Sequence, residues 1–162
     1  MAGDAEHLAL IEKLYKGLDD HDGEAMASCY SDTAHFRDPA FGDLDADGVK
    51  AMWRMLCGRA EDLKVELAEH DADGDRGSAH WIATYTFSTG RHVVNDIQAT
   101  FRFGPDGLIA DHVDDFDFHR WAGQALGAPG KLLGWFPPFH AAVSRKARGD
   151  LEKFQAGDRA PA

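Results

Sequence analysis

Apolar residues in the first third of the chain recur at helical spacing. Leu8, Ile11, Leu14, Tyr15 and Leu18 form one apolar face, which predicts an amphipathic helix. The acidic stretch 19–22 interrupts this pattern and ends the helix. The first third therefore begins with one long helix.

Two further helices and a short strand follow. Asp22 is a suitable N-cap for a short helix that carries Met26, Cys29 and Tyr30. Residues 34–38 alternate like a strand that stops at Pro39. Asp45 or Asp47 then caps a third helix, whose core stripe is formed by Val49, Met52, Trp53 and Leu56.

The pattern of the second half of the chain predicts strands. Residues 63–68, 78–88, 92–103 and 108–118 alternate or are rich in β-formers, and turn residues at 73–74, 89–90 and 105–107 separate them. Short turns between strands predict an antiparallel meander with strong twist and bulges. Helices first and a meander second predict an α+β domain, in which N-terminal helices lie on one face of a curved, mainly antiparallel sheet.

The chain continues beyond this core of about residues 6–118. Residues 119–126 predict a short helix, 127–134 a loop and 139–154 a longer helix, with a frayed tail at 157–162. We therefore interpret 1–162 as one domain with a helical extension at 119–156. The apolar stretch 132–139 is expected to close the mouth of a pocket or to pack on a second subunit.

Charge and hydropathy exclude several classes of partner. Lys and Arg number 17 against 28 Asp and Glu, which gives a formal net charge of −11 without any basic run. This balance argues against binding to nucleic acid or to anionic lipid. The most apolar stretch is eight residues long, and the N-terminus does not resemble a secretory signal. Cys29 and Cys57 are outside any CxxC pattern and are expected to be reduced thiols of a cytoplasmic protein.

Asp38 is the first candidate for chemistry. It shares a strand phase with Ala34 and Phe36, so its carboxyl should point between the sheet and the helices. Loss of hydration there would raise its pKa toward the range of a general base. The structural alternative is that Asp38 caps the turn at Pro39 and Ala40.

His112 and Asp114 are the second candidate. They lie two apart on the last strand, in phase with Phe116 and Phe118, so both should face the interior. A His beside an Asp suits proton transfer, with the Asp orienting the ring. The alternatives are a satisfied polar pair at a sheet edge, or a metal site completed by His119. We expect no metal and no cofactor.

An aromatic interior with a few polar groups is typical of a small-molecule pocket. Asn95 lies in an otherwise apolar strand phase and needs a hydrogen-bond partner, which a ligand oxygen can supply. The residues expected to contact such a ligand are Tyr15, Trp53, Trp81, Tyr85, Asn95, Phe101, Phe116 and Trp135. Core packing is the alternative for the aromatic ones.

The order of elements resembles the nuclear transport factor 2-like superfamily, which includes SnoaL-like polyketide cyclases, ketosteroid isomerases and limonene epoxide hydrolases. Three motifs carry the resemblance over about residues 6–118. They are Tyr30-Ser31-Asp32-Thr33-Ala34 leading to Arg37-Asp38-Pro39, Phe101-Arg102-Phe103 with the Asp106-Gly107 turn, and His112-Val113-Asp114-Asp115-Phe116-Asp117. The resemblance implies a cone-shaped sheet wrapped on helices around a pocket.

The resemblance allows the catalytic residues of each related enzyme class to be compared with this sequence, residue by residue. Asp38 matches the general base of the steroid isomerases, but their oxyanion-hole Tyr and Asp fall on Leu14 and Ala99. Asp114 matches the last-strand Asp of the epoxide hydrolases, but their other Arg and Asp fall on Ile97 and Ala99. His112 and Asp114 resemble the His and Asp of the cyclases. Steroid isomerisation is therefore not expected.

These observations predict a cytoplasmic, dimeric cone-fold protein that binds an apolar small molecule. Its chemistry would be cofactor-free acid–base catalysis of the isomerase, cyclase or hydratase and hydrolase type, with Asp38, His112 and Asp114 as catalytic residues. The alternative is a non-catalytic ligand-binding or dimerisation module on the same fold.

Overall fold

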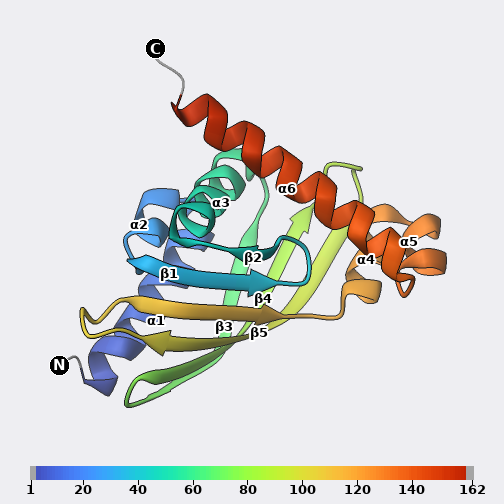
Figure 1. Ribbon diagram of the computed structural model, residues 1–162. Coiled ribbons are helices and arrows are strands. Elements are labelled where there is room, and N and C mark those ends of the chain that lie inside the picture. The colour runs from blue at the N-terminus through green and yellow to red at the C-terminus, as the bar shows by residue number, and fades with distance from the viewer. Residues whose placement is uncertain (1–2, 160–162) are drawn as a thin grey trace.

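Six strands form one sheet against which the helices pack (Figure 1). The structure, a computed structural model, describes residues 3–159. The helices are α1 (Asp4–Asp19), α2 (Gly23–Ala27), α3 (Ala46–Arg59), α4 (Phe118–Leu126), α5 (Ala128–Leu133) and α6 (Pro137–Arg159). The strands are β1 (Tyr30–Asp38), β2 (Gly42–Leu44), β3 (Lys64–Asp73), β4 (Arg76–Thr86), β5 (His92–Phe103) and β6 (Ile109–Asp115).

The strand order is β2-β1-β6-β5-β4-β3. Strands β3 to β6 form the predicted antiparallel meander, and β1 pairs with β6 in parallel. Register shifts interrupt the ladder in β3, between β5 and β6, and between Tyr30 and His35 of β1. Such irregularities bend strands and increase twist. The α+β prediction of a curved, mainly antiparallel sheet with N-terminal helices and a C-terminal extension is confirmed.

Helices α2 and α3 have the N-caps that the sequence predicts. Asp22 Oδ1 accepts a hydrogen bond from the backbone N–H of Ala25 (3.0 Å), and Asp45 Oδ1 accepts one from Gly48 (2.8 Å). Each satisfies a backbone donor that the first helical turn leaves open. Of the two predicted caps for α3, the structure selects Asp45.

The main core lies between these helices and the inner face of the sheet. Strand β5 alternates strictly, with every second residue from Val93 to Phe103 buried. The largest fully buried side chains come from both layers and include Ile11, Leu14 and Tyr15 on α1, Met52 on α3, and Tyr30 and Phe36 on β1. The inner face of the sheet is therefore the face on which interior chemistry must be sought.

The C-terminal extension forms a second, smaller core at one end of the sheet. Val93, Phe118, Trp121, Ala122 and Ala125 are its buried residues. Helix α6 then runs back from α4 and α5 toward α3, where Leu151 is 2% exposed within the main core (Figure 1).

Several predictions about elements are wrong in detail. Strand β3 continues to Asp73, and β6 ends at Asp115, so that Phe118 begins α4 and does not continue the strand. Tyr30 begins β1 instead of continuing α2, and β2 was not predicted. The predicted loop at 127–134 contains α5, because Gly127 turns the chain with a φ of +72° and Gly130 lets α5 approach α4 closely. A Cβ at Gly130 would lie 1.9 Å from the carbonyl oxygen of Ala122.

The predicted frayed tail, 157–162, overlaps the end of α6, which continues through Arg159. Residues 160–162 lie outside the described part of the chain. Within residues 3–159, no helix is long and apolar enough to cross a membrane.

Candidate active site

Two carboxyl groups meet on the inner face of the sheet, on strands that are far apart in the sequence. The parallel pairing of β1 with β6 places Phe36 opposite His112. Two residues further along each strand are Asp38 and Asp114, which point to the same face. Burial is the largest cause of the raised pKa of Asp38, and the charge of Asp114 adds to it, so the two groups lie close enough to interact.

Asp114 is held by His112, which is completely buried. His112 Nε2 lies 2.9 Å from Asp114 Oδ1, and His112 Nδ1 lies 2.8 Å from the hydroxyl oxygen of Tyr30. The same hydroxyl accepts a hydrogen bond from Trp53 Nε1 (2.8 Å). Both ring nitrogens of His112 are therefore occupied by protein groups.

The rings around His112 leave little room for its imidazole to move. Phe36 stands edge-on to it with ring centroids 5.0 Å apart, and Phe101 lies at 4.5 Å. Asp114 itself is 5% exposed. The pair of side chains is thus fixed by packing as well as by hydrogen bonds.

Asp38 serves the turn and faces Asp114 at the same time. Its Oδ1 accepts hydrogen bonds from the backbone N–H groups of Ala40 (3.0 Å) and Phe41 (2.6 Å). Burial raises the pKa of Asp38 from its ordinary 3.8 to about 7, although these backbone donors lower it. The capping role and a raised pKa, which the sequence offered as alternatives, occur together.

Two buried donors near the carboxyl pair have no hydrogen-bond partner among the described residues. They are the Tyr15 hydroxyl and Trp81 Nε1, on side chains 2% and 4% exposed. Their rings lie 5.1 Å apart, and the charge of Asp114 adds to the effect of burial in raising the pKa of Tyr15. The other three tryptophans donate their indole N–H, Trp53 to Tyr30, Trp121 to Tyr85 and Trp135 to the Leu132 carbonyl.

The structure brings most of the predicted site residues to the inner face. Asn95 and Phe101 are buried there, and Tyr85 and Phe116 are partly buried between the two cores. Trp53 contacts the site through Tyr30. Trp135 does not join them, because it is 67% exposed at the junction of α5 and α6.

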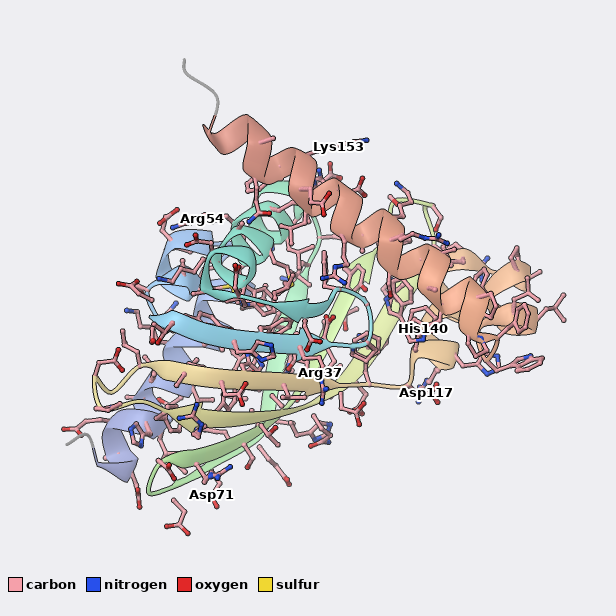
Figure 2. All side chains as sticks on the ribbon, in the orientation of Figure 1. Arg37, Arg54, Asp71, Asp117, His140 and Lys153 are labelled. Carbon is pink, nitrogen blue, oxygen red and sulfur yellow. The ribbon has the colours of Figure 1, made fainter. Side chains whose placement is uncertain are left out.

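The structure places part of the stretch 132–139, which is expected to close a pocket mouth or to pack on a second subunit, at the protein surface. Leu132 is 70% exposed, so this part of the stretch points outward. The contact beside Asp38 comes instead from His140 on α6, whose Nε2 donates to the Pro39 carbonyl oxygen (2.5 Å). Its ring stacks on Phe118 with centroids 3.7 Å apart, near the labelled Asp117 (Figure 2).

Sequence reasoning missed Tyr30 and His140 as site residues. Tyr30 shares the even-numbered phase of Phe36 and Asp38, which is the available signal, but the register shift in β1 and the helical prediction obscured it. His140 carries no sequence signal, since its position depends on how α6 returns across the fold.

His119, the possible metal ligand, instead contacts the Lys131 carbonyl oxygen (2.8 Å). Among the described residues, no cluster of three or more His, Cys, Asp or Glu side chains is arranged to hold a metal ion.

Comparison with known proteins agrees with this architecture. A search of curated proteins finds no match. Among solved structures, a SnoaL-like protein of unknown function from Burkholderia thailandensis shares 21% identity over 72% of this chain and 98% of its own, with a TM-score of 0.59. An LEH-like epoxide hydrolase from M. tuberculosis shares 18% identity over 83% and 98%, with a TM-score of 0.65.

A pinacolase, BvnE from Penicillium brevicompactum, shares 15% identity over 70% of this chain and 84% of its own, with a TM-score of 0.60. At these identities the likeness concerns the fold. The family profile of the SnoaL-like domain matches residues 11–112, more than half of the chain. The protein therefore belongs to the SnoaL-like family, on the nuclear transport factor 2-like fold.

Proposed function

We propose that this protein is a cofactor-independent acid–base enzyme that acts on an apolar small molecule at the inner face of the sheet. The observation that carries the proposal is the pairing of Asp38 with Asp114. A carboxyl whose pKa is about 7 is half protonated near neutral pH, so Asp38 can both take and give a proton.

The two carboxyl groups divide the work. Burial, with a further contribution from the charge of Asp114, keeps Asp38 protonated at mildly acidic pH. Asp114 is hydrogen-bonded to His112. Asp38 then exchanges a proton with the ligand, while Asp114 positions it or stabilises positive charge. His112 is a positioning residue in this arrangement.

Two buried donors indicate where the polar end of a ligand would lie. Leaving a buried donor without a partner costs about 1–3 kcal/mol. An acceptor oxygen between the Tyr15 hydroxyl and Trp81 Nε1 would remove that cost, and the surrounding Phe101 and Phe116 suit an apolar body. His112 and Tyr15 are closed to water in this structure, so a ligand reaches them only when the protein opens.

The names of two structural neighbours, an epoxide hydrolase and a pinacolase, fit acid–base chemistry on small organic molecules. For this chain, isomerisation, cyclisation, and hydration or hydrolysis share the requirement for a proton donor and acceptor. We therefore propose this reaction class without assigning one member of it.

The test is a search for turnover with two types of substrate. Proton exchange next to the carbonyl of cyclic ketones is followed by NMR in deuterated water, and hydrolysis of cyclic epoxides is followed by chromatography. Asp38→Asn and Asp114→Asn should each lower kcat/KM by about 100-fold or more. Asp45→Asn, which changes an exposed cap, should leave it unaltered.

A non-catalytic ligand-binding or dimerisation module is the second candidate. The closed carboxyl cluster and the exposed Leu132 and Trp135 favour it. Native mass spectrometry distinguishes the two, because a co-purified ligand returned unchanged, together with an ordinary pKa for Asp38, supports the module.

We further propose a cytoplasmic homodimer, supported by the free, buried thiols of Cys29 and Cys57 and by the exposed apolar side chains of Leu132 and Trp135.

A further inference from the structure

We infer that Trp53 and Tyr30 are positioning residues: they fix the direction of a four-membered hydrogen-bond chain, so that His112 stays neutral and directs the proton on its Nε2 at Asp114. The chain runs from Trp53 Nε1 to the Tyr30 hydroxyl, to His112 Nδ1, and from His112 Nε2 to Asp114 Oδ1. Its three distances are 2.8, 2.8 and 2.9 Å.

The direction follows from the first member. An indole N–H only donates, so the Tyr30 oxygen must accept from Trp53. Tyr30 is 1% exposed, and burial together with the charge of Asp114 raises the pKa of its hydroxyl, which therefore carries its proton. In the described part of the chain, the acceptor that lies against this proton is Nδ1 of His112.

The remaining assignments follow from the second member. If Nδ1 accepts from Tyr30, the ring proton of neutral His112 is on Nε2 and points at Asp114 Oδ1. A charged imidazolium, or a tautomer with its proton on Nδ1, would leave the buried Tyr30 proton without an acceptor. The cost of such an orphaned group favours the neutral Nε2–H form by about 5-fold to 150-fold.

The neutral state of His112 affects the pKa of Asp38. The titratable groups around His112 and Asp114 are Tyr15 on α1, Tyr30 and Asp38 on β1, and Asp114 on β6, while α3 and β5 contribute Trp53 and Phe101. With His112 neutral, no positive charge among these groups offsets Asp114. The indole of Trp53 thereby sustains the negative charge that raises the pKa of Asp38.

The inference rests on the proposed pairing of Asp38 with Asp114, but its test does not measure turnover. In protein with ¹⁵N-labelled histidine, the ring of His112 is assigned through its contacts with Phe36 and Phe101. We expect a pyridine-type Nδ1 signal and a pyrrole-type Nε2 signal that do not change between pH 5 and pH 8. Titration of the Asp38 carboxyl is followed by ¹³C NMR.

Tyr30→Phe removes the donor to Nδ1. His112 should then take up a proton in this pH range, and the pKa of Asp38 should fall by about one pH unit or more because the imidazolium offsets Asp114. Trp53→Phe should give a mixture of both tautomers, and it provides the same readout if Tyr30→Phe does not fold. The matched control is Tyr85→Phe, which removes a hydroxyl that likewise accepts from a tryptophan, Trp121 at 2.9 Å, outside the chain.

A pyrrole-type Nδ1 in the unaltered protein, titration of His112 between pH 5 and pH 8, or an unchanged His112 in both variants would overturn the inference. A confirmed tautomer in a protein that turns over neither substrate type would leave the inference standing and count against the proposed function. Turnover with a freely titrating His112 would do the reverse.

Discussion

Replacing Asp38 by Asn should stabilise the fold at alkaline pH, even though it removes the proposed proton donor. In the folded protein the pKa of Asp38 is about 7, against an ordinary value of 3.8. Below the lower value the carboxyl is protonated in both states, and above it the unfolded chain releases its proton first. Stability therefore falls as the pH rises from about 4 through 7.

The size of this effect follows from the two pKa values. Their difference corresponds to about 4 kcal/mol at about 1.4 kcal/mol per pH unit, and coupling to Asp114 makes about 2–4 kcal/mol the expected range. Asn keeps an oxygen for the N–H groups of Ala40 and Phe41, so the turn itself should persist. Asp38→Asn should thus gain this amount over the unaltered protein between pH 4 and pH 8.

Urea unfolding at several pH values measures the difference in unfolding free energy between the two proteins. Using the difference cancels the titration of all groups that both proteins share. Asp45→Asn, at an exposed cap with a similar backbone hydrogen bond, should show no comparable pH-dependent gain. A flat difference between pH 4 and pH 8 would refute the reasoning that Asp38 in the folded state keeps its proton up to about pH 7.

Three further predictions concern Asp114, the contact between α4 and α5, and the C-terminal extension. Asp114→Asn should lower the pKa of Asp38, measured by ¹³C NMR, because a neighbouring negative charge is lost. Asp115→Asn, on the opposite face of β6, should leave this pKa unchanged. Equal effects of the two variants would contradict the assigned faces. Gly130→Ala should cost about 2–4 kcal/mol in chemical unfolding, since its Cβ would meet the Ala122 carbonyl, while Gly149→Ala in open space on α6 should be neutral or stabilising by about 0.5–1 kcal/mol. Deleting residues 130–162 should lower Tm, because Leu151 leaves the main core, and unchanged Tm and ligand binding would exclude a role for the extension.

Hydrophobic periodicity and helix-capping residues were sufficient to predict most elements of the fold. The caps at Asp22 and Asp45, the helical stripe from Leu8 to Leu18, and the alternation of 92–103 each depend on neighbours within a few residues. The prediction of a loop at 127–134 is wrong because glycines such as Gly127 and Gly130 are typical of loops. In the structure they permit a turn and a close helix contact, which a single sequence does not distinguish from flexibility.

The site was predictable as a set of inward-facing residues but not as a network. Strand phase placed Asp38, His112 and Asp114 on one face, and the structure adds that β1 and β6 are neighbours in parallel. That pairing, the bulge in β1 and the approach of α3 together bring Tyr30 and Trp53 to His112. None of these three is encoded in local periodicity, so the direction of the hydrogen-bond chain could not be inferred beforehand.

The parallel pairing of β1 with β6 also bears on how the protein folds. Strands β3 to β6 can form in sequence through short hairpin turns, whereas β1 must find β6 across the whole of that meander, as the 82-residue separation of Tyr30 and His112 illustrates. Contacts of such long range carry a loop-closure cost and form slowly. We therefore expect the meander to form first. The two carboxyl groups should come together only when β1 pairs with β6, at the stage when the hydrophobic contacts around them also form.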